Sequence, residues 1–286
     1  MDDFRGQTAL VTGASSGIGL ALAAGFAHRG ADIVIAALPN EKLATAAAWL
    51  RARHPVTVHE IGIDLAFEEG PDKLAARVAE LDLTIDVLVN NAGFGVHGNY
   101  HTLDMEQNHR EVMLLCSAVE RMTHLFLPGM LERGRGTLIN LSSVQGFQAV
   151  PHMAVYGAAK AFVLSFTTAL WAEYRASGVR ILALCPAQTE TDFFDDLGYQ
   201  VATGGRMRTP EEVVATAFRG LRRGRPHVID GWQYRLSANA PRFLPRGLVA
   251  RITERVLHPS KMTRPARPPR PLLVDDAEAG ANTSAA

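Results

Sequence analysis

Tyr156 and Lys160 stand four residues apart in a predicted helix, and Ser143 lies thirteen residues before the tyrosine. Side chains at positions i and i+4 of a helix project from the same face, one turn apart. A phenol is a poor base at neutral pH, but a neighbouring ammonium favours the phenolate and lowers its pKa. A serine hydroxyl beside the pair can orient a carbonyl or an alcohol. These three residues are therefore candidates for proton transfer to or from a substrate oxygen.

A glycine-rich loop near the N-terminus could hold a dinucleotide. Gly13, Gly17 and Gly19 follow a short apolar run and open a predicted helix. Glycines here permit a tight turn and let a pyrophosphate approach the backbone N–H groups at the helix N-terminus, where the dipole favours anions. Such a loop could also be no more than a tight turn. The order of strand, glycines and helix favours the dinucleotide site.

The residue that would read the cofactor's ribose is not evident. The second predicted strand ends in Ala36-Ala-Leu-Pro39, which offers neither an acid for a 2′-hydroxyl nor an arginine for a 2′-phosphate. NAD and NADP both stay open, with NADP slightly favoured. Asp64, after the third strand, could hydrogen-bond the adenine edge, or it could be a solvated N-cap before Leu65.

Short β-rich runs alternate with longer helical runs, which predicts an α/β domain whose parallel sheet is covered on both faces. Several strand candidates are almost continuously apolar, as expected for strands buried on both faces. Strands are expected at residues 9–12, 32–36, 56–64, 86–90, 136–142, 179–185 and 227–229. Helices are expected at residues 17–29, 40–53, 68–81, 103–132, 150–177, 209–223 and 241–258.

Together these motifs resemble the short-chain dehydrogenase/reductase family. The resemblance covers about residues 6–235 and rests on Thr12-Gly-Ala-Ser-Ser-Gly-Ile-Gly19, Asp64-Leu65, Asn90-Asn-Ala-Gly93, Asn140-Leu-Ser-Ser143, Tyr156-x-x-x-Lys160 and Pro186-x-x-Thr189-x-Thr191. It implies a Rossmann-type, doubly wound fold with a seven-stranded parallel sheet and helices on both faces. It also implies a homodimer or homotetramer.

The resemblance further implies an NAD(P)-dependent oxidoreductase that moves a hydride between nicotinamide and a carbonyl/alcohol pair. Tyr156 would be the acid/base, Ser143 would position the substrate, and Lys160 would lower the tyrosine pKa and bind the nicotinamide ribose. The residues expected around the cofactor are Gly13, Ser15, Ser16, Gly17, Ile18, Gly19, Asp64, Leu65, Asn91, Ala92, Gly93, Tyr156, Lys160, Pro186, Thr189 and Thr191.

One position departs from the family pattern. The helix before the fifth strand normally carries an asparagine that fixes a water linking the lysine to solvent, and that position here is Leu115. Asn108 lies two turns earlier, roughly 10 Å along the axis, which is too far to substitute without a register shift. Three interpretations stay open. The one we favour is a reductase with another proton route; the others are a cofactor-binding protein without turnover and a non-redox lyase or cyclase.

Three stretches are expected to form the lip of the substrate pocket: 94–100, 144–153 and 193–199. Their Phe, Val, Met and Tyr content favours a fairly bulky apolar substrate. His97, His101 and His152 could add polar contacts, although ordinary surface histidines are the simpler interpretation. No metal site is expected, because no carboxylate or cysteine spacing accompanies these histidines.

The net charge of zero conceals a basic segment. Residues 204–270 hold 15 of the 29 basic residues but only four of the 29 acidic ones. This segment could be a solvated surface, a contact for an anionic substrate such as a phosphopantetheine carrier, or a membrane-surface helix at 241–258. The last interpretation rests on an apolar residue at every fourth position: Leu244, Leu248, Ile252 and Val256. Nucleic-acid binding is not expected, since no recognition motif accompanies the charge.

The length of 286 residues suits one large domain. We expect a dinucleotide-binding and catalytic domain over 1–240, an amphipathic helix over 241–258 and a disordered tail over 259–286. Two cysteines form no disulfide framework, and no stretch looks able to span a bilayer, so the cytoplasm is the expected location. Oligomer contacts are expected on the two long helices, and core packing explains the same apolar residues equally well: Leu114, Val119, Phe162, Phe166, Leu170 and Trp171.

Overall fold

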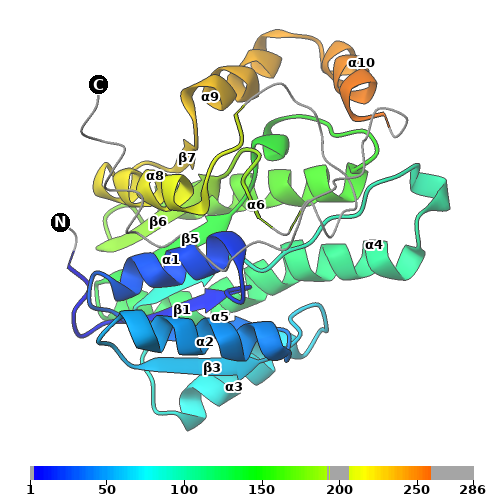
Figure 1. The fold of residues 1–286 in the computed structure, drawn as a ribbon. Helices are drawn as coiled ribbons and strands as arrows, with labels where there is room; N and C mark the ends of the chain where they lie inside the picture. The colour runs from blue at the N-terminus through cyan, green and yellow to red at the C-terminus, as the bar shows by residue number, and fades with distance from the viewer. Residues whose placement is uncertain (1–2, 192, 194–205, 259–286) are drawn as a thin grey trace, which may run out of the picture.

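A computed structural model describes residues 3–191, 193 and 206–258, and Figure 1 colours the chain along its length. Seven parallel strands form one sheet in the order β3-β2-β1-β4-β5-β6-β7, which confirms the predicted Rossmann-type architecture. The strands are β1 (Thr8–Thr12), β2 (Asp32–Ala37), β3 (Val58–Gly62), β4 (Val87–Asn90), β5 (Gly136–Leu141), β6 (Val179–Cys185) and β7 (His227–Ile229). The predicted tail over 259–286 and the lip residues 194–199 lie outside the described residues.

Helices cover both faces of the sheet (Figure 1). One face carries α1 (Gly17–Ala27), α2 (Glu41–Arg53) and α8 (Pro210–Arg222). The other carries α3 (Gly70–Glu80), α5 (Ala118–Glu132) and α6 (Ala154–Glu173). Successive side chains of a strand point to opposite faces, so Ala9 and Val11 join the first apolar cluster and Leu10 joins the second. Burial on both faces explains why the strands read as continuous apolar runs.

The strand order reverses beside β1, and this reversal creates the crevice for a ligand. The chain leaves β1 through α1 to β2 and β3 on one side, then returns to β4 on the other side of β1. Val11 of β1 is in register with Val89 of β4. The loops that follow these two strands therefore diverge at the carboxyl edge of the sheet, where open α/β sheets bind their ligands.

The helix predicted over 103–132 is not a uniform α-helix. It begins as α4 (Met105–Val112), passes through a π-helical turn at Met113–Ser117 and continues as α5. A π-turn accommodates one extra residue, and such turns are frequent at functional sites. Position 115, where the sequence lacks the expected asparagine, lies inside this turn.

The C-terminal part differs from the prediction in two ways. A helix that was not predicted, α9 (Trp232–Asn239), follows β7, and a short 3₁₀ turn at Ala240–Phe243 comes after it. The last helix, α10 (Arg246–Leu257), begins five residues later than predicted from position 241. Pro245 stands directly before its first residue, and a proline is tolerated at a helix start because its missing N–H needs no partner there. In Figure 1, α9 and α10 lie at the top of the view, and they contribute Tyr234 and Leu257 to the cavity described below.

Helix α6, which carries Tyr156 and Lys160, has 20 residues and is long and apolar enough, by length and composition alone, to cross a membrane. The expectation that no stretch meets this test was therefore wrong. The same composition is typical of a core helix, and α6 packs against β5 and β6 with Val163 and Thr167 buried.

Candidate active site

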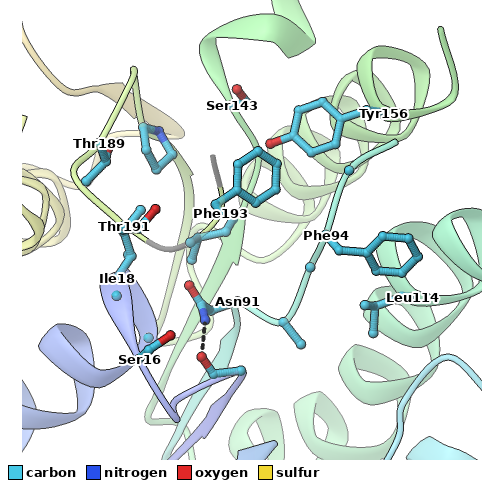
Figure 2. A pocket seen from close by; sticks show the side chains of 18 of the residues that line it. Ser16, Ile18, Asn91, Phe94, Leu114, Ser143, Tyr156, Thr189, Thr191 and Phe193 are labelled. Atoms are coloured by element: carbon cyan, nitrogen blue, oxygen red, sulfur yellow. Dashed lines mark hydrogen bonds between the residues drawn. The ribbon is translucent and has the colours of Figure 1, made fainter. Parts of the chain in front are cut away.

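A cavity of about 490 Å³ lies at the carboxyl edge of the sheet. Every residue predicted to bind the cofactor or to act in catalysis lines it, from Gly13 in the glycine loop to Tyr156 on α6. Figure 2 shows these side chains arriving from separate segments: Ser16 and Ile18 after β1, Asn91 and Phe94 after β4, and Thr189 and Thr191 after β6. The fold therefore gathers the predicted residues into one site.

The glycine loop fits a dinucleotide because its backbone leaves no room for side chains. Gly13 and Gly17 have φ values of +64° and +56°, in the left-handed region that favours glycine. A Cβ added to Gly19 would lie 2.4 Å from both the Asn91 amide nitrogen and the Gly13 carbonyl oxygen. The side chain of Ser16, the N-cap of α1, makes no capping hydrogen bond among the described residues. The first N–H groups of α1 thus suit a phosphate.

Asn91 and Thr12 fasten the glycine loop to β4. The Asn91 side-chain amide donates to the carbonyl oxygens of Thr12 at 2.8 Å and Gly13 at 3.1 Å. The Thr12 hydroxyl oxygen accepts from the N–H groups of Asn91 at 3.0 Å and Ala92 at 3.1 Å. The Asn91 amide thus shapes the loop, and Figure 2 shows it pointing at the loop backbone. Sequence reasoning missed Thr12, whose side chain looks like an ordinary strand residue.

At the adenosine end of the cavity, Asp64 is held by the protein. Its carboxylate accepts from the Arg110 guanidinium at 2.6 Å and from the Ala66 N–H at 2.9 Å. The interpretation of Asp64 as an N-cap before Leu65 was wrong, because α3 begins only at Gly70. Contact of Asp64 with an adenine edge stays a prediction.

Lys42 also lines this end of the cavity. It sits in the first turn of α2, which Asn40 caps by accepting from the Leu43 N–H at 3.3 Å. The end of β2 holds no basic residue, and the first turn of the following helix supplies one. A search that included the first turn of the helix after β2 would have found Lys42.

Tyr156 and Ser143 meet at the opposite end of the cavity, with the tyrosine hydroxyl directed toward the serine (Figure 2). Burial raises the pKa of Tyr156 above its ordinary value, and the hydrogen bond with Ser143 opposes this rise only in part. This is opposite to the lowering expected from Lys160. A protonated phenol is suited to give a proton rather than to take one.

The ammonium of Lys160 is buried and hydrogen-bonded. It donates to the Leu141 carbonyl oxygen at 2.7 Å, and it lies 5.6 Å from the centre of the Tyr156 ring. Burial lowers the pKa of Lys160 to about 8. The Ser142 hydroxyl donates to the Lys160 carbonyl oxygen at 2.7 Å. The end of β5 therefore holds both the side chain and the backbone of Lys160.

A network of buried amides and hydroxyls lies beneath the site. Asn90 at the end of β4 donates to the Asn140 side-chain oxygen at 2.9 Å. Asn140 in turn donates to the Thr167 hydroxyl at 3.0 Å, and Asn90 also donates to the Thr123 hydroxyl at 3.3 Å. The network joins β4, β5, α5 and α6, so the segments that carry Ser143, Tyr156 and Lys160 are held in a fixed relation.

Leu115, at the position of the expected asparagine, is buried against Tyr156, Val150 and Met153. A Cβ added to Gly93 would lie 2.9 Å from the leucine methyl and 3.9 Å from the Lys160 nitrogen. Leu115 therefore stands next to Lys160 and offers it no hydrogen bond.

One turn earlier lies Glu111, a residue that sequence reasoning did not consider. It is fully buried, and one carboxylate oxygen accepts from the Val96 N–H at 3.3 Å. The other oxygen is buried without a hydrogen-bond partner among the described residues. Burial raises the pKa of Glu111 to about 7, against the opposing influence of the Lys160 charge.

The wall beside Tyr156 is apolar. Phe193 packs on the tyrosine with ring centres 5.6 Å apart, and a Cβ on Gly95 would lie 3.1 to 3.4 Å from Phe193, Met153 and Tyr156. From the three predicted lip stretches, the described residues that line the cavity are Phe94, Gly95, His97, Val144, Gln145, Met153 and Phe193. Leu114, Tyr234 and Leu257 complete this wall and had not been placed there.

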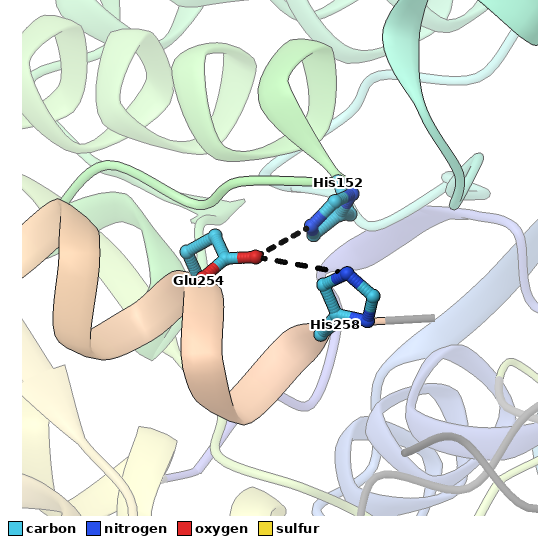
Figure 3. Close-up of side chains that lie close together, drawn as sticks. All are labelled: His152, Glu254 and His258. Atoms are coloured by element: carbon cyan, nitrogen blue, oxygen red, sulfur yellow. Dashed lines mark ion pairs between the residues drawn. The ribbon is translucent and has the colours of Figure 1, made fainter. Parts of the chain in front are cut away.

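The histidines fall into different surroundings. His101 is exposed and does not line the cavity. His97 contacts the Leu257 carbonyl oxygen at 3.1 Å, and burial lowers its pKa. His152 pairs with Glu254 at 3.6 Å, and His258 reaches the same carboxylate oxygen at 3.9 Å (Figure 3).

The ligand atoms of His152, Glu254 and His258 all lie within 4.8 Å of one another, and this donor set could hold a divalent cation. The residue spacing around His152 did not indicate this group, and the expectation that no metal binds stays untested. The partner carboxylate comes from a helix a hundred residues away, and it ties α10 to the loop before α6.

Part of the basic segment serves the fold. Arg208 contacts Asp230 and Glu212, each at 2.7 Å, and Asp230 is completely buried. Arg208 is therefore not available for an anionic substrate.

Comparison with known proteins agrees with this geometry. Residues 7–201 match the model of the short chain dehydrogenases. The chain belongs to the short-chain dehydrogenase family.

Two relatives illustrate the range of similarity. The very-long-chain 3-oxoacyl-CoA reductase of Bos taurus is 35% identical over 190 residues, which are 65% of this chain and 60% of the relative. The chain thus spans about three fifths of that relative's length. Oxidoreductase UcpA of Salmonella typhimurium is 33% identical over 203 residues, 70% of this chain and 76% of the relative.

Solved structures are similar over more of the chain. A short-chain dehydrogenase from Sphingobium yanoikuyae in complex with NADPH has a TM-score of 0.74 at 30% identity, and the match covers 93% of this chain and 99% of that one. The bulky-bulky ketone specific alcohol dehydrogenase from Comamonas testosteroni has a TM-score of 0.70 at 29% identity, with 92% and 97% covered.

Proposed function

We propose that the protein is an NADPH-dependent reductase of a carbonyl group carried by a long or bulky apolar molecule. A single observation carries the proposal: the hydroxyls of Tyr156 and Ser143 meet at an apolar wall of the cavity whose far end holds the glycine loop. A 3-oxoacyl thioester is the first substrate class to test, and a bulky ketone is the second.

The residues of the chain act on the substrate oxygen. The Ser143 hydroxyl donates a hydrogen bond to the carbonyl, and Tyr156 donates its proton to the same oxygen as the carbonyl is reduced. The raised pKa of Tyr156 keeps this proton in place at neutral pH. The bound cofactor supplies the hydride. The apolar wall beside Tyr156 limits the access of water to the transferred proton.

The substrate class rests on the wall and on the relatives. Met153, Phe193 and Leu257 cluster with Tyr156, and Phe94 and Leu114 line the same cavity, which suits a long chain or two large substituents. The names of two similar proteins specify a very-long-chain 3-oxoacyl-CoA and a bulky-bulky ketone.

The preference for NADPH rests on Lys42. It lines the cavity just beyond β2, where the ribose 2′ position is read in this fold, and the sequence offers no acid there for a 2′-hydroxyl. A point charge on a flexible stem is suited to a phosphate. A structurally similar dehydrogenase is in complex with NADPH.

The test is NADPH oxidation, followed by its absorbance, with 3-oxoacyl-CoA esters of increasing chain length and with a panel of bulky ketones. Tyr156→Phe should lower kcat at least a hundredfold while NADPH fluorescence still reports binding, because only the transferred proton is removed. Undiminished turnover in this variant would refute the assignment. Binding of NADPH without oxidation by any compound would favour the binding protein, and turnover without net redox change would favour the lyase or cyclase.

The expected homo-oligomer stays a proposal. Phe162 is 40% exposed on α6 and stacks on Phe166 with ring centres 5.7 Å apart, so this pair is available for a contact between copies. Val119 is buried within the single chain and is therefore removed from the expected contact residues. Light scattering on wild type and Phe162→Ser tests the assembly.

A further inference from the structure

Glu111 is a charged residue placed where the fold offers it almost no solvation. It is fully buried on α4, one of its oxygens bonds only a backbone N–H, and the other has no hydrogen-bond partner among the described residues. A buried carboxyl with an unsatisfied oxygen costs free energy that an apolar side chain would avoid. The burial of Glu111 therefore does not serve stability, and a role in the reaction is the alternative.

The packing of α4 against α6 brings Glu111 toward the site, and Leu115, one turn after Glu111, lies beside the Lys160 ammonium. The charge of Lys160 lowers the pKa of Glu111, and the charge of Glu111 raises the pKa of Tyr156. Cys116, in the adjoining π-turn, is coupled to both Glu111 and Lys160. The carboxyl therefore interacts electrostatically with the two α6 residues that surround the transferred proton.

We propose that Glu111 is the proton relay that replenishes Tyr156 through Lys160. Leu115 offers the lysine no polar contact on its side of the cavity, so the polar group of this helix lies one turn earlier. This inference rests on the proposed function, since a relay is needed only if Tyr156 gives a proton in each turnover.

The protons balance as follows. Tyr156 transfers its proton to the substrate oxygen and becomes a phenolate. The Lys160 ammonium gives a proton to the phenolate, and the Glu111 carboxylic acid gives its proton to the lysine. The resulting carboxylate takes a proton from solvent, so each turnover consumes one solvent proton. A carboxyl whose pKa is near 7 can both give and regain a proton at neutral pH.

The experiment compares Glu111→Gln with the exposed control Glu120→Gln on the same long helix. We expect E111Q to bind NADPH as wild type does, to lose at least tenfold in kcat, and to lose the inflection near pH 7 in the kcat profile. Glu111→Asp should retain part of the rate, and it serves if E111Q does not fold. E120Q should match wild type.

A second pair of variants moves the polar group back to the position of the expected asparagine. E111L should be slow, and E111L combined with Leu115→Asn should recover rate, because the polar group again stands beside Lys160. An E111Q enzyme with the wild-type rate and pH profile would overturn the proposal. Failure of L115N to raise the rate of E111L would overturn it as well.

A readout without turnover separates this proposal from the proposed function. Infrared titration of the protein without cofactor should show one carboxyl that ionises near pH 7 in wild type and not in E111Q. Absence of that carboxyl sinks the relay even if the reductase assignment stands. If no compound of the panel oxidises NADPH while the carboxyl still ionises near pH 7, the reductase assignment is refuted, and the relay then has no reaction to serve.

A separate observation concerns the surface of α9 and α10. Seven of the 14 large apolar side chains that are exposed among the described residues lie between positions 232 and 256. They are Trp232, Leu236, Phe243, Leu244, Leu248, Ile252 and Val256. Helix α10 buries the opposite face through Val249, Thr253 and Leu257. The stripe predicted from sequence thus faces outward, and we call these seven residues the α9–α10 patch.

The patch is framed by positive charge. Five exposed arginines lie between positions 232 and 258, with Glu254 as the single acid in that range. They are Arg235, Arg242, Arg246, Arg251 and Arg255. An apolar stripe flanked by arginines is typical of a helix that lies in the interface of an anionic bilayer.

We infer that the α9–α10 patch docks the protein on an anionic lipid surface. The same two helices contribute Tyr234 and Leu257 to the cavity wall, so docking would bring the wall next to the membrane. Charge complementarity selects lipid over a second copy of the chain, since two patches with the same excess of arginines repel each other.

The test is co-sedimentation with vesicles of phosphatidylcholine alone and of phosphatidylcholine with phosphatidylglycerol. Wild type should pellet with the anionic vesicles and be released by salt. Leu248→Ser with Ile252→Ser should reduce the bound fraction at least tenfold, and Arg251→Gln with Arg255→Gln should act similarly. Arg222→Gln with Arg223→Gln, at the end of α8, is the matched control and should bind normally.

Two outcomes overturn the inference. One is wild type that stays in the supernatant with both kinds of vesicle. The other is light scattering that shows a wild-type dimer and a monomer for L248S/I252S, because the patch would then join two copies of this chain.

Discussion

The ammonium of Lys160 is hydrogen-bonded to the carbonyl oxygen of Leu141 at 2.7 Å, at the point where β5 gives way to the loop that carries Ser143. One buried charge therefore both fixes the active-site loop and stands beside Tyr156. The pKa of Lys160, lowered to about 8 by burial, makes the consequence measurable.

Between pH 8 and 9 the unfolded chain holds the Lys160 proton more tightly than the native one, so stability should rise with pH over this window. Lys160→Met lacks this contribution. Urea unfolding should therefore show the free energy of unfolding of wild type rising relative to that of K160M as pH rises. Both proteins contain the same two cysteines, so the difference between them reports on the lysine. A difference in unfolding free energy that does not change with pH would mean that burial does not lower the pKa of Lys160.

Glu111→Gln should stabilise the protein at neutral pH. Burial raises the pKa of Glu111 from 4.5 to about 7, so the native state binds more protons than the unfolded chain between these values. Wild type then loses stability as pH rises from 4.5 to 7, by about 3 kcal/mol on the usual conversion of pKa differences. E111Q keeps an acceptor for the Val96 N–H and should lack this loss. Parallel unfolding curves for the two proteins across this range would contradict the buried ionisation.

Gly19→Ala should weaken dinucleotide binding at least tenfold. The new methyl group would meet the Asn91 amide and the Gly13 carbonyl at 2.4 Å, so the loop must open where a pyrophosphate is expected to bind. The matched control is Gly247→Ala on α10, where a Cβ meets nothing within 4 Å. NADPH fluorescence should show the G247A affinity unchanged and G19A weakened at least tenfold. Retained affinity in G19A would place the cofactor elsewhere.

Lys42→Ala should weaken NADPH binding about tenfold, equal to roughly 1.4 kcal/mol, and leave NADH binding nearly unchanged. The reason is the loss of the charge proposed to face the 2′-phosphate. Lys73→Ala serves as the control, since Lys73 is exposed on α3 and pairs with Glu69. Equal losses for both cofactors in K42A would show that the lysine does not read the phosphate.

The sequence was sufficient for the order of the sheet elements and for the motifs of the site, although it missed helix α9. The alternation of strands and helices and the spacing of Gly13 to Gly19, Ser143, Tyr156 and Lys160 predicted both the sheet and the set of residues that meets in the cavity. These features follow from chain order, because parallel strands with right-handed crossovers place their carboxyl ends along one edge.

The sequence was insufficient where distant segments decide the environment of a residue. Glu111 reads as an ordinary helix glutamate until packing encloses it, and Glu254 gives no sign that it will meet His152. The lowering of the Tyr156 pKa was expected from its neighbour four residues on, whereas burial, a property of the whole fold, sets the opposite direction.

The π-helical turn at Met113–Ser117 makes backbone length, as well as residue type, a condition for the catalytic arrangement. Each residue of a helix advances the chain by about 100° around the axis, so removal of one residue here would rotate α4 relative to α5 by that angle. The carboxyl of Glu111 would turn away from α6, while α5 would stay packed on the sheet. Single-residue insertions and deletions in this turn should therefore damage proton supply more than they damage folding.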